Sequence, residues 1–315
     1  MPPSPTVPDI SILHAIILGI ANGATEFLPV SSTAHMRILP AILHWGDPGA
    51  AFSAVVQLGP IAAIIWFFRH DLAKYIAGIV RSLKAKTLFP EGDVDARLGW
   101  YTILGTIPFA IAGKLLENYV DYAFRSLYIV GASLIVLALV LMAAERVSRR
   151  DTSLEQLSFG AAMAIGCSQI LALIPGASRS GCTITMGLFA GLDRESAARF
   201  SFLLSIPAIT LAGVYKLYKV VHHTHLGHAA VPYLIGAIVS GVLAYIVIRW
   251  LLGYLGKENH TTTPFIIYRI VLGIVILVLV KVGYVNPEAG AKDVDPPAKS
   301  AAQITIPMPA HLASR

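Results

Sequence analysis

Four ionisable residues interrupt otherwise apolar stretches of this 315-residue sequence, namely Glu26, His35, Arg37 and Arg179. A charge at the centre of a bilayer costs about 2.5–3.5 kcal/mol on translocon scales, so charges in apolar segments usually have partners and functions. Ser32 and His35 are three residues apart, and a helix that starts at Ser32 would place both on one face. With Glu26 close by, these residues combine a hydroxyl, an imidazole and a carboxylate, as nucleophilic catalysis requires.

The three residues fit several chemistries. In the favoured one, Ser32 is the nucleophile, His35 is the base and later the acid, and Glu26 either orients His35 or binds a divalent cation. Two variants use His35 itself or a water molecule as the nucleophile. The structural alternative is an ion pair that only holds two segments together. The hydroxyl groups around these charges favour the functional interpretation.

A second polar segment, residues 175–183 with the sequence PGASRSGCT, has the features of a phosphate site. Pro175 and Gly176 break a helix, and Ser178 is a favourable N-cap for the next one. A helix N-terminus offers free N–H groups to phosphate, and the planar fork of Arg179 can bind two phosphate oxygens. The segment's further hydroxyl groups are those of Ser180 and Thr183. The structural alternative is a capped helix break whose arginine extends to the membrane surface.

The composition indicates a membrane protein built of helices. Apolar residues make up 56% of the chain and charged residues 13%, and the mean hydropathy is +0.69. Soluble domains carry about 25% charged residues. The long continuous apolar runs differ from the ~10-residue alternating strands of a membrane β-barrel. The net charge of +6 is explained by basic residues in cytoplasmic loops. No nucleic-acid partner is expected, because aromatic residues do not interleave with basic clusters.

Six runs are long enough to span a membrane, since a span needs about 20 mostly apolar residues. They are 50–68, 98–116, 126–144, 200–218, 230–248 and 264–282. Two further stretches, 12–43 and 159–192, are broken by proline, glycine, hydroxyl groups and charges. Backbone freed at such breaks is stable in a membrane only inside protein or beside a wet cavity. The predicted fold class is therefore an all-α integral membrane protein with six transmembrane helices and two re-entrant helical hairpins in an inverted repeat.

The two halves of the chain resemble each other. Pro29 and Pro175 open similar tetrapeptides 146 residues apart, and Pro60 and Pro207 lie 147 residues apart in the following spans. Broken helices at matching positions of two halves indicate a binding site near the membrane midplane. The predicted organisation is an N-terminal tail (1–11), one membrane domain (12–285) with repeats over about 12–144 and 159–282, and a disordered C-terminal tail (286–315).

Basic residues predict the orientation. Loops 69–97, 145–158, 193–199 and 249–263 hold 13 of the 24 Lys and Arg residues, so this set is predicted to face the cytoplasm. Both termini are then predicted to face outward. Arg269, like Arg37 and Arg179, lies inside an apolar stretch.

The polar segments together resemble one family. Residues 23–35 (GATEFLPVSSTAH) and 175–183 strongly resemble the undecaprenyl-diphosphate phosphatases, also called bacitracin-resistance proteins. The resemblance extends through 55–59 (VVQLG) and 200–204 (FSFLL) and covers about residues 12–283.

The resemblance implies an inner-membrane enzyme that removes one phosphate from undecaprenyl diphosphate and so recycles the lipid carrier of peptidoglycan synthesis. It also implies an active site toward the periplasm and dependence on Mg²⁺ or Ca²⁺. The expected catalytic residues are Glu26, Ser32, His35 and Arg179, with Glu26 as the candidate metal ligand. The expected substrate-binding residues are Asn22, Ser31, Thr33, Gln57, Gly176, Ser178, Ser180 and Thr183. The expected partners are this lipid substrate and the membrane lipids, and a homodimer is left open.

One position departs from the family pattern, and one alternative function is kept. The family usually has Glu or Gln four residues before the residue matched by Glu26, where this chain has Asn22. If that position must ligate metal, the metal site here is weaker or different. The alternative is a transporter or flippase of polyprenyl phosphate, because broken helices around an anion site also describe secondary transporters. A transporter needs no nucleophile, so Ser32, His35 and Glu26 favour the enzyme.

Overall fold

A computed structural model describes residues 10–116, 126–223 and 230–288. Within these residues the regular elements are helices. This agrees with an apolar chain, since a helix pairs its backbone groups internally. The first half contains α1 (Ile12–Thr25), α2 (Ser32–Ile42), α3 (Gly49–Val56), α4 (Leu58–Phe67), α5 (Arg69–Lys84), α6 (Val94–Leu115) and α8 (Leu127–Val147). The second half contains 3₁₀ turns η1 (Leu154–Gln156) and η2 (Gln169–Leu173), and helices α9 (Phe159–Ser168), α10 (Arg179–Phe189), α11 (Arg194–His223), α12 (Ala230–Leu255) and α13 (Thr263–Lys281).

Each predicted span coincides with helical structure. Four described helices are long and apolar enough to cross a membrane alone: α8, α12, α13 and the Arg194–Tyr215 part of α11. A fifth crossing is added if Ala51–Phe67 and α5, which are bent by 71° at Phe68, form one broken span. The predicted loop 69–97 is therefore partly wrong, because α5 occupies its first 16 residues. The apolar helices establish a multi-pass membrane architecture without fixing six crossings.

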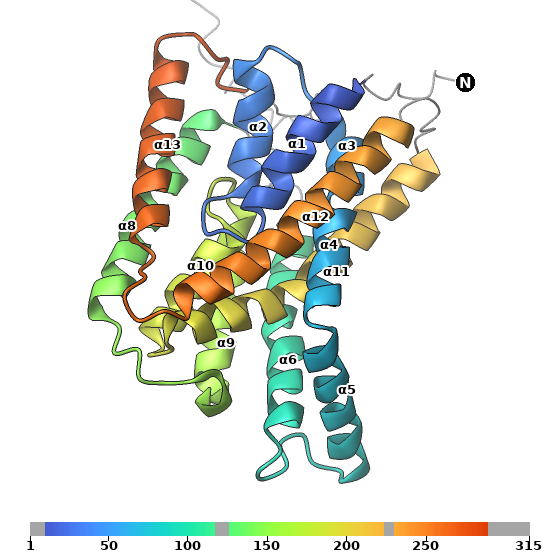
Figure 1. Cartoon of the computed structure of the whole chain (residues 1–315), viewed down its shortest axis with the longest axis vertical. Helices are drawn as coiled ribbons and strands as arrows, with labels where there is room; N and C mark the ends of the chain where they lie inside the picture. Colours follow the sequence, from blue (N-terminus) through green and yellow to red (C-terminus); the bar gives the residue numbers. More distant parts are fainter. Residues whose placement is uncertain (1–9, 117–125, 224–229, 289–315) are drawn as a thin grey trace, which may run out of the picture.

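The two predicted hairpins are built from short apolar helices. α1 has 14 residues, and α9 with η2 covers 15. From rises of about 1.5 Å per α-helical and 2.0 Å per 3₁₀ residue, α1 reaches ~21 Å and α9 with η2 ~25 Å, both less than the ~30 Å of a hydrocarbon core. Each arm turns back into a second short helix, α2 or α10. Figure 1 shows α2 in the upper half of the molecule and α10 in the lower half, so the two helices approach its middle from opposite ends.

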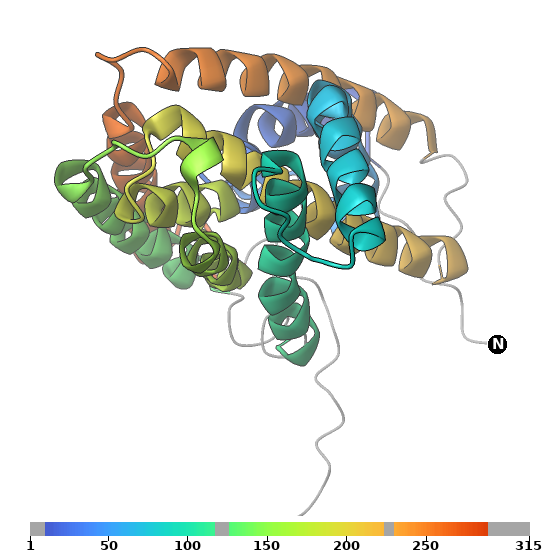
Figure 2. The ribbon, with the colours of Figure 1, turned by 90° about the horizontal axis from the view of Figure 1, so that it is seen from below.

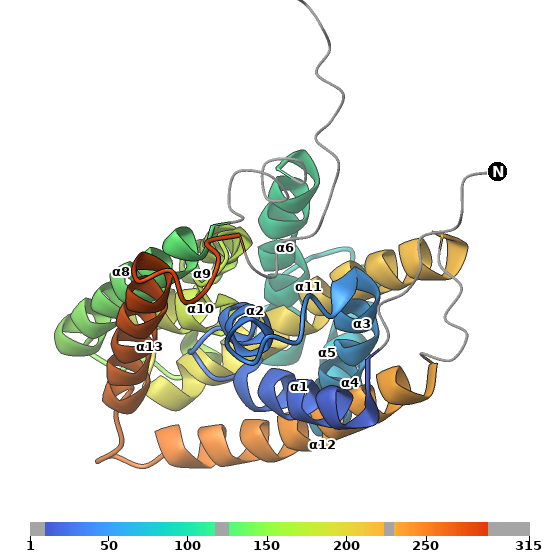
Figure 3. The same cartoon turned by 90° about the horizontal axis from the view of Figure 1, so that it is seen from above.

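Each half of the chain packs its equivalent helices on the other half. α1 packs on α12 as α9 packs on α6, and α4 packs on α12 as α11 packs on α6. Helices α8 and α13, the last of each half, pack side by side (Figure 3). Paired glycines allow the close approach of α1 to α12 and of α9 to α6. A Cβ at Gly19 would lie 2.6 Å from the Gly236 oxygen, and one at Gly166 would lie 2.3 Å from the Gly105 oxygen.

The structure also corrects the register between the halves. The matching N-caps are Ser31 and Ser178, 147 residues apart, so Ser32 corresponds to Arg179 rather than to Ser178. The offset of 146 inferred from the prolines before each turn is therefore wrong by one residue. Pro29 and Pro175 belong to loops of unequal length. The 147-residue spacing agrees with that of Pro60 and Pro207.

The four basic loops lie together. Residues from all four line one charged cavity of about 710 Å³ at the ends of α5, α6, α11 and α12. Ion pairs stabilise this end, including Arg199 with Asp71 at 2.6 Å, and Arg194 with Glu145. Figures 1 and 2 show α5 and α6 side by side, extending from this end. Most of the predicted N-terminal tail and of the tail predicted from residue 286 lies outside the described residues.

Candidate active site

The site begins with two helix N-termini that face the same cavity. Ser31 caps α2 by accepting from the Ala34 N–H, and Ser178 caps α10 by accepting from the Gly181 N–H. Both serines adopt positive φ, +72° and +68°, which L residues rarely do and which costs about 1–3 kcal/mol. Backbone strain of this kind concentrates at functional sites. The same unusual conformation at the same cap in both halves brings the first residues of α2 and α10 to the cavity.

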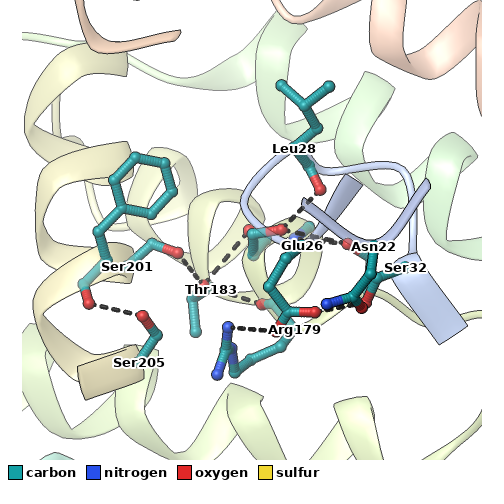
Figure 4. A network of polar contacts seen from close by, with 12 residues as sticks. Asn22, Glu26, Leu28, Ser32, Arg179, Thr183, Ser201 and Ser205 are labelled. Carbon is teal, nitrogen blue, oxygen red and sulfur yellow. Dashed lines mark hydrogen bonds and ion pairs between the residues drawn. The ribbon is translucent and has the colours of Figure 1, made fainter. Parts of the chain in front are cut away.

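Those first residues are Ser32 and Arg179, and Glu26 joins them. The Ser32 hydroxyl donates to Glu26 Oε2 at 2.7 Å, and Arg179 Nη2 donates to Glu26 Oε1 at 3.1 Å (Figure 4). The side chains of Glu26 and Arg179 are only 9% and 12% exposed. A charge pair removed from water in this way is strong but costly to desolvate. The first hairpin therefore supplies a serine bonded to a carboxylate, and the second supplies the cation beside it.

Eight of the twelve predicted site residues line one cavity of about 210 Å³ between the hairpins. They are Glu26, Ser31, Ser32, Thr33, Gln57, Gly176, Ser178 and Arg179. The other lining side chains are apolar and come from η2 and the residue after it, from α6 and from α11: Phe109, Ala172, Ile174, Ile209 and Ala212. Arg179 Nε is buried and has no hydrogen-bond partner among the described residues. The cavity thus combines an unused guanidinium donor, hydroxyl groups and a carboxylate with an apolar wall.

His35 lies apart from the Ser32–Glu26 pair. Its Nδ1 is 2.7 Å from the Ser31 carbonyl oxygen and must donate to it, because a carbonyl only accepts. In the neutral ring Nε2 then accepts from the Tyr268 hydroxyl, at 2.6 Å. The predicted contact between Ser32 and His35 is therefore not formed. Both residues lie in the first turn of α2, but the Ser31 carbonyl and the Tyr268 hydroxyl hold the imidazole toward α13.

Three other predicted residues have partners away from the cavity. The Ser180 hydroxyl donates to the Leu28 carbonyl at 2.8 Å. The Thr183 hydroxyl lies 2.6 Å from that of Ser201 (Figure 4). Both contacts hold α10 against its neighbours, so the geometry gives no support to their prediction as phosphate ligands. The Asn22 amide, 4% exposed, donates to Ser240 at 3.0 Å and joins α1 to α12.

No role was predicted for Arg269 of α13, which is fully buried beneath both hairpin turns. Its guanidinium donates to the carbonyls of Pro29 and Ala177, at 3.3 and 2.8 Å. The Ser133 hydroxyl of α8 supports the second turn by donating to Pro175 O at 2.6 Å. An arginine inside an apolar run was the available signal for Arg269. A lone serine in α8 carried none.

Few carboxylates of the cavity are available to bind a cation. No group of three His, Cys, Asp or Glu side chains suited to a metal occurs among the described residues. Glu26 is the one acidic residue among those that line the cavity. Mg²⁺ commonly uses only one or two carboxylates and takes its other ligands from water and substrate phosphates. The residues therefore fit a cation that arrives with a diphosphate, and do not fit a cation held by protein alone.

Comparisons with known proteins agree with this chemistry. Residues 15–275 match the family model described as bacitracin resistance protein BacA. A relative from Myxococcus xanthus named undecaprenyl-diphosphatase is 45% identical, over 93% of this chain and 97% of its own length. Proteins of the same name from Chloroherpeton thalassium and a Nocardioides species are 48% and 44% identical, over 87% and 88% of this chain and 98% and 99% of their own.

Proposed function

The chain belongs to the BacA family of bacitracin resistance proteins, and from this membership we propose that it is a membrane undecaprenyl-diphosphatase. It hydrolyses undecaprenyl diphosphate to undecaprenyl phosphate and inorganic phosphate. The product is the lipid carrier for peptidoglycan and other envelope polymers, and this activity underlies bacitracin resistance. One observation carries the proposal. Ser32 is bonded to a buried carboxylate next to Arg179, at a cavity between two broken hairpins.

The geometry supports Ser32 as the nucleophile and Glu26 as the group that receives its proton. Ser32 Oγ attacks the terminal phosphorus and forms a phosphoserine. The bond from that phosphorus to the bridging oxygen breaks, and undecaprenyl phosphate leaves. Water then attacks the phosphoserine, releases inorganic phosphate and regenerates Ser32. Arg179 stabilises the charge on the phosphoryl oxygens in both steps, usually the largest single contribution to such catalysis.

His35 has a supporting place in this scheme. Its two ring nitrogens contact Ser31 and Tyr268, so it helps to hold the start of α2. Attack by His35 or directly by water remains an alternative to attack by Ser32. A trapped phosphohistidine would contradict the Ser32 scheme.

We also propose a divalent cation, Mg²⁺ or Ca²⁺, bound by Glu26 together with the substrate diphosphate. When bound, it would neutralise phosphate charge. Residues of the chain itself bind the rest of the substrate. Arg179 binds phosphate oxygens, and the N-termini of α2 and α10 present N–H groups to the anion. The apolar side of the cavity accommodates the first part of the isoprenoid chain.

The proposed topology has six crossings and two re-entrant hairpins in an inverted repeat, in the bacterial inner membrane. Three features support this topology: the equivalent helix contacts between the two halves, the matching caps of α2 and α10, and the short hairpin arms. The shared cavity of the four basic loops supports one cytoplasmic face. The hairpin site is then open to the periplasmic side. A homodimer stays a prediction that the mass of the detergent-solubilised protein can test.

The second candidate is a transporter or flippase of polyprenyl phosphate. The same anion site between broken helices favours it. The hydrogen bond from Ser32 to Glu26 favours the enzyme instead, because moving an anion needs no activated hydroxyl. The two functions differ in whether phosphate is released.

The test measures phosphate release from undecaprenyl diphosphate by purified protein in detergent, with Mg²⁺ and with chelator. Ser32→Ala and Arg179→Ala are compared with Ser53→Ala and Arg249→Ala, which change exposed residues outside the site. We expect release that needs the cation, collapses in both site variants and persists in both controls. Release that survives Ser32→Ala but not Arg179→Ala would remove the serine nucleophile. No release from well-folded protein would contradict the phosphatase and favour transport.

A further inference from the structure

Arg269 has the environment of a residue with a specific task. It is 0% exposed, and the four hydrogen bonds that the structure gives it all go to main-chain carbonyls. None of them goes to a carboxylate. A buried guanidinium without an ion-pair partner is expensive, and an apolar side chain could fill the same volume at lower cost. The charge therefore compensates for the carbonyl groups that the two hairpin turns leave unpaired.

The four carbonyls belong to three segments that meet at the site. Nη1 donates to Pro29 of the first turn, at 3.3 Å. Nη2 lies 2.8 Å from the oxygen of Ala177 and 3.5 Å from that of Gly176, both in the second turn. Nε donates to Leu134 of α8 at 3.3 Å. One planar group thus joins both turns to the helix behind them.

The helix that carries Arg269, α13, packs tightly against α8. Arg269 and Gly273 are four residues apart on one face of α13, and a Cβ at Gly273 would lie 2.8 Å from the Gly131 oxygen of α8. The backbones of α8 and α13 therefore touch one turn from the guanidinium. Gly181 makes room for it, because a Cβ there would lie only 2.4 Å from Nη1.

The turns that Arg269 holds lead directly into the proposed catalytic residues. Ser32 is the first residue of α2 and Arg179 the first of α10, each two or three residues beyond an accepting carbonyl. Ser32 and Arg179 come from different hairpins and meet at Glu26. Any change in the distance between the two turns therefore changes the distance between the nucleophile and the phosphate-binding cation.

We propose that Arg269 is a positioning residue of the phosphatase. It sets the spacing of the two hairpin turns and thereby holds Ser32 and Arg179 in register across the cavity. The inference rests on the proposed function. It adds a residue that acts through the others and touches neither substrate nor reacting atoms.

The experiment compares Arg269→Lys and Arg269→Gln with wild type and with Arg249→Lys, a control at an exposed arginine of α12. kcat and KM are measured for phosphate release from undecaprenyl diphosphate, and folding is followed by thermal melting in detergent. We expect kcat to fall at least tenfold, toward the ~100-fold that a ~1 Å misplacement can cost, with KM changed much less. Lysine keeps the charge but cannot reach four carbonyls, so it should not restore kcat.

A second variant disturbs the same contact without removing the arginine. Gly181→Ala places a methyl group against Nη1 and should lower kcat in the same direction by a smaller factor. This variant remains informative if both Arg269 variants fail to fold.

The outcomes separate the inference from the function. Wild-type kcat in folded Arg269→Lys or in folded Gly181→Ala would overturn the positioning role. A loss of activity that only follows the fraction of folded protein would do the same. If wild type and Arg249→Lys release no phosphate, the proposed function itself fails and the inference fails with it.

Discussion

At the scale of single residues, Glu26 organises the site because it is the partner of both neighbours. One oxygen accepts from Ser32 and the other from Arg179. Glu26 was predicted either to orient His35 or to bind a metal ion. From the geometry we propose a third task, acceptance of the serine proton. The geometry places His35 with Tyr268, whose ring is parallel to the imidazole within 4°.

The first prediction concerns the charge of Glu26. Glu26→Gln keeps the size of the side chain but removes the anion that accepts from Ser32 and pairs with Arg179. We expect phosphate release to fall about 10²–10⁴-fold, the usual contribution of a positioned base. Glu91→Gln, at an exposed loop position, is the matched control and should retain activity. Comparable rates for the two folded variants would show that Glu26 does not receive the proton.

At the scale of elements, the two turns depend on main-chain conformations that few residues adopt. Gly176 has φ +90° and lies against α8, where a Cβ would be 2.2 Å from Ser133 Oγ and 2.5 Å from the Val130 oxygen. Ser31 and Ser178 also have positive φ, but their cap hydrogen bonds compensate. The turns are therefore stabilised both by their own serine caps and by hydrogen bonds from α8 and α13.

The second prediction compares two glycines. Gly176→Ala should destabilise the protein by at least the ~1–3 kcal/mol of a strained φ, because its new methyl group also meets backbone. Gly160→Ala in α9 is the control, since nothing lies within 4 Å of a Cβ there. Alanine is favoured over glycine by about 1 kcal/mol in a helix, so the control should be neutral or slightly stabilising. Thermal melting in detergent distinguishes the two. Equal midpoints would show that the second turn tolerates a side chain.

At the scale of the whole molecule, polar groups gather at two places. One is the cavity between the hairpins, and the other is the charged cavity formed by the four basic loops. Between them the apolar helices α8, α12 and α13 expose large hydrophobic side chains, as surfaces in contact with lipid do. This arrangement separates the proposed reaction from the face that we assign to the cytoplasm.

The third prediction tests that assignment. In a cysteine-free background, Lys86→Cys and Lys257→Cys lie in the basic loops, whereas Asp47→Cys is exposed between α2 and α3. A membrane-impermeant maleimide added to intact cells should label position 47 after outer-membrane permeabilisation. Positions 86 and 257 should react only after lysis. Labelling of all three in intact cells would contradict the topology, and labelling of 86 and 257 alone would invert it.

The sequence by itself determined the membrane class and predicted eight of the residues that line the cavity between the hairpins. A chain whose apolar runs are long and continuous spans lipid as helices, and charges or helix breakers in those runs mark where polar chemistry is concentrated. Glu26, Ser32 and Arg179 were predicted in this way. Only the tertiary structure decided which of them touch, because hydrogen bonds between segments 153 residues apart do not follow from local spacing. It paired Ser32 with Glu26 instead of His35, turned Ser180 and Thr183 toward neighbouring helices, and placed Arg269 beneath both turns. A buried carbonyl takes whichever donor the packing brings to it, and that packing is a property of the whole fold.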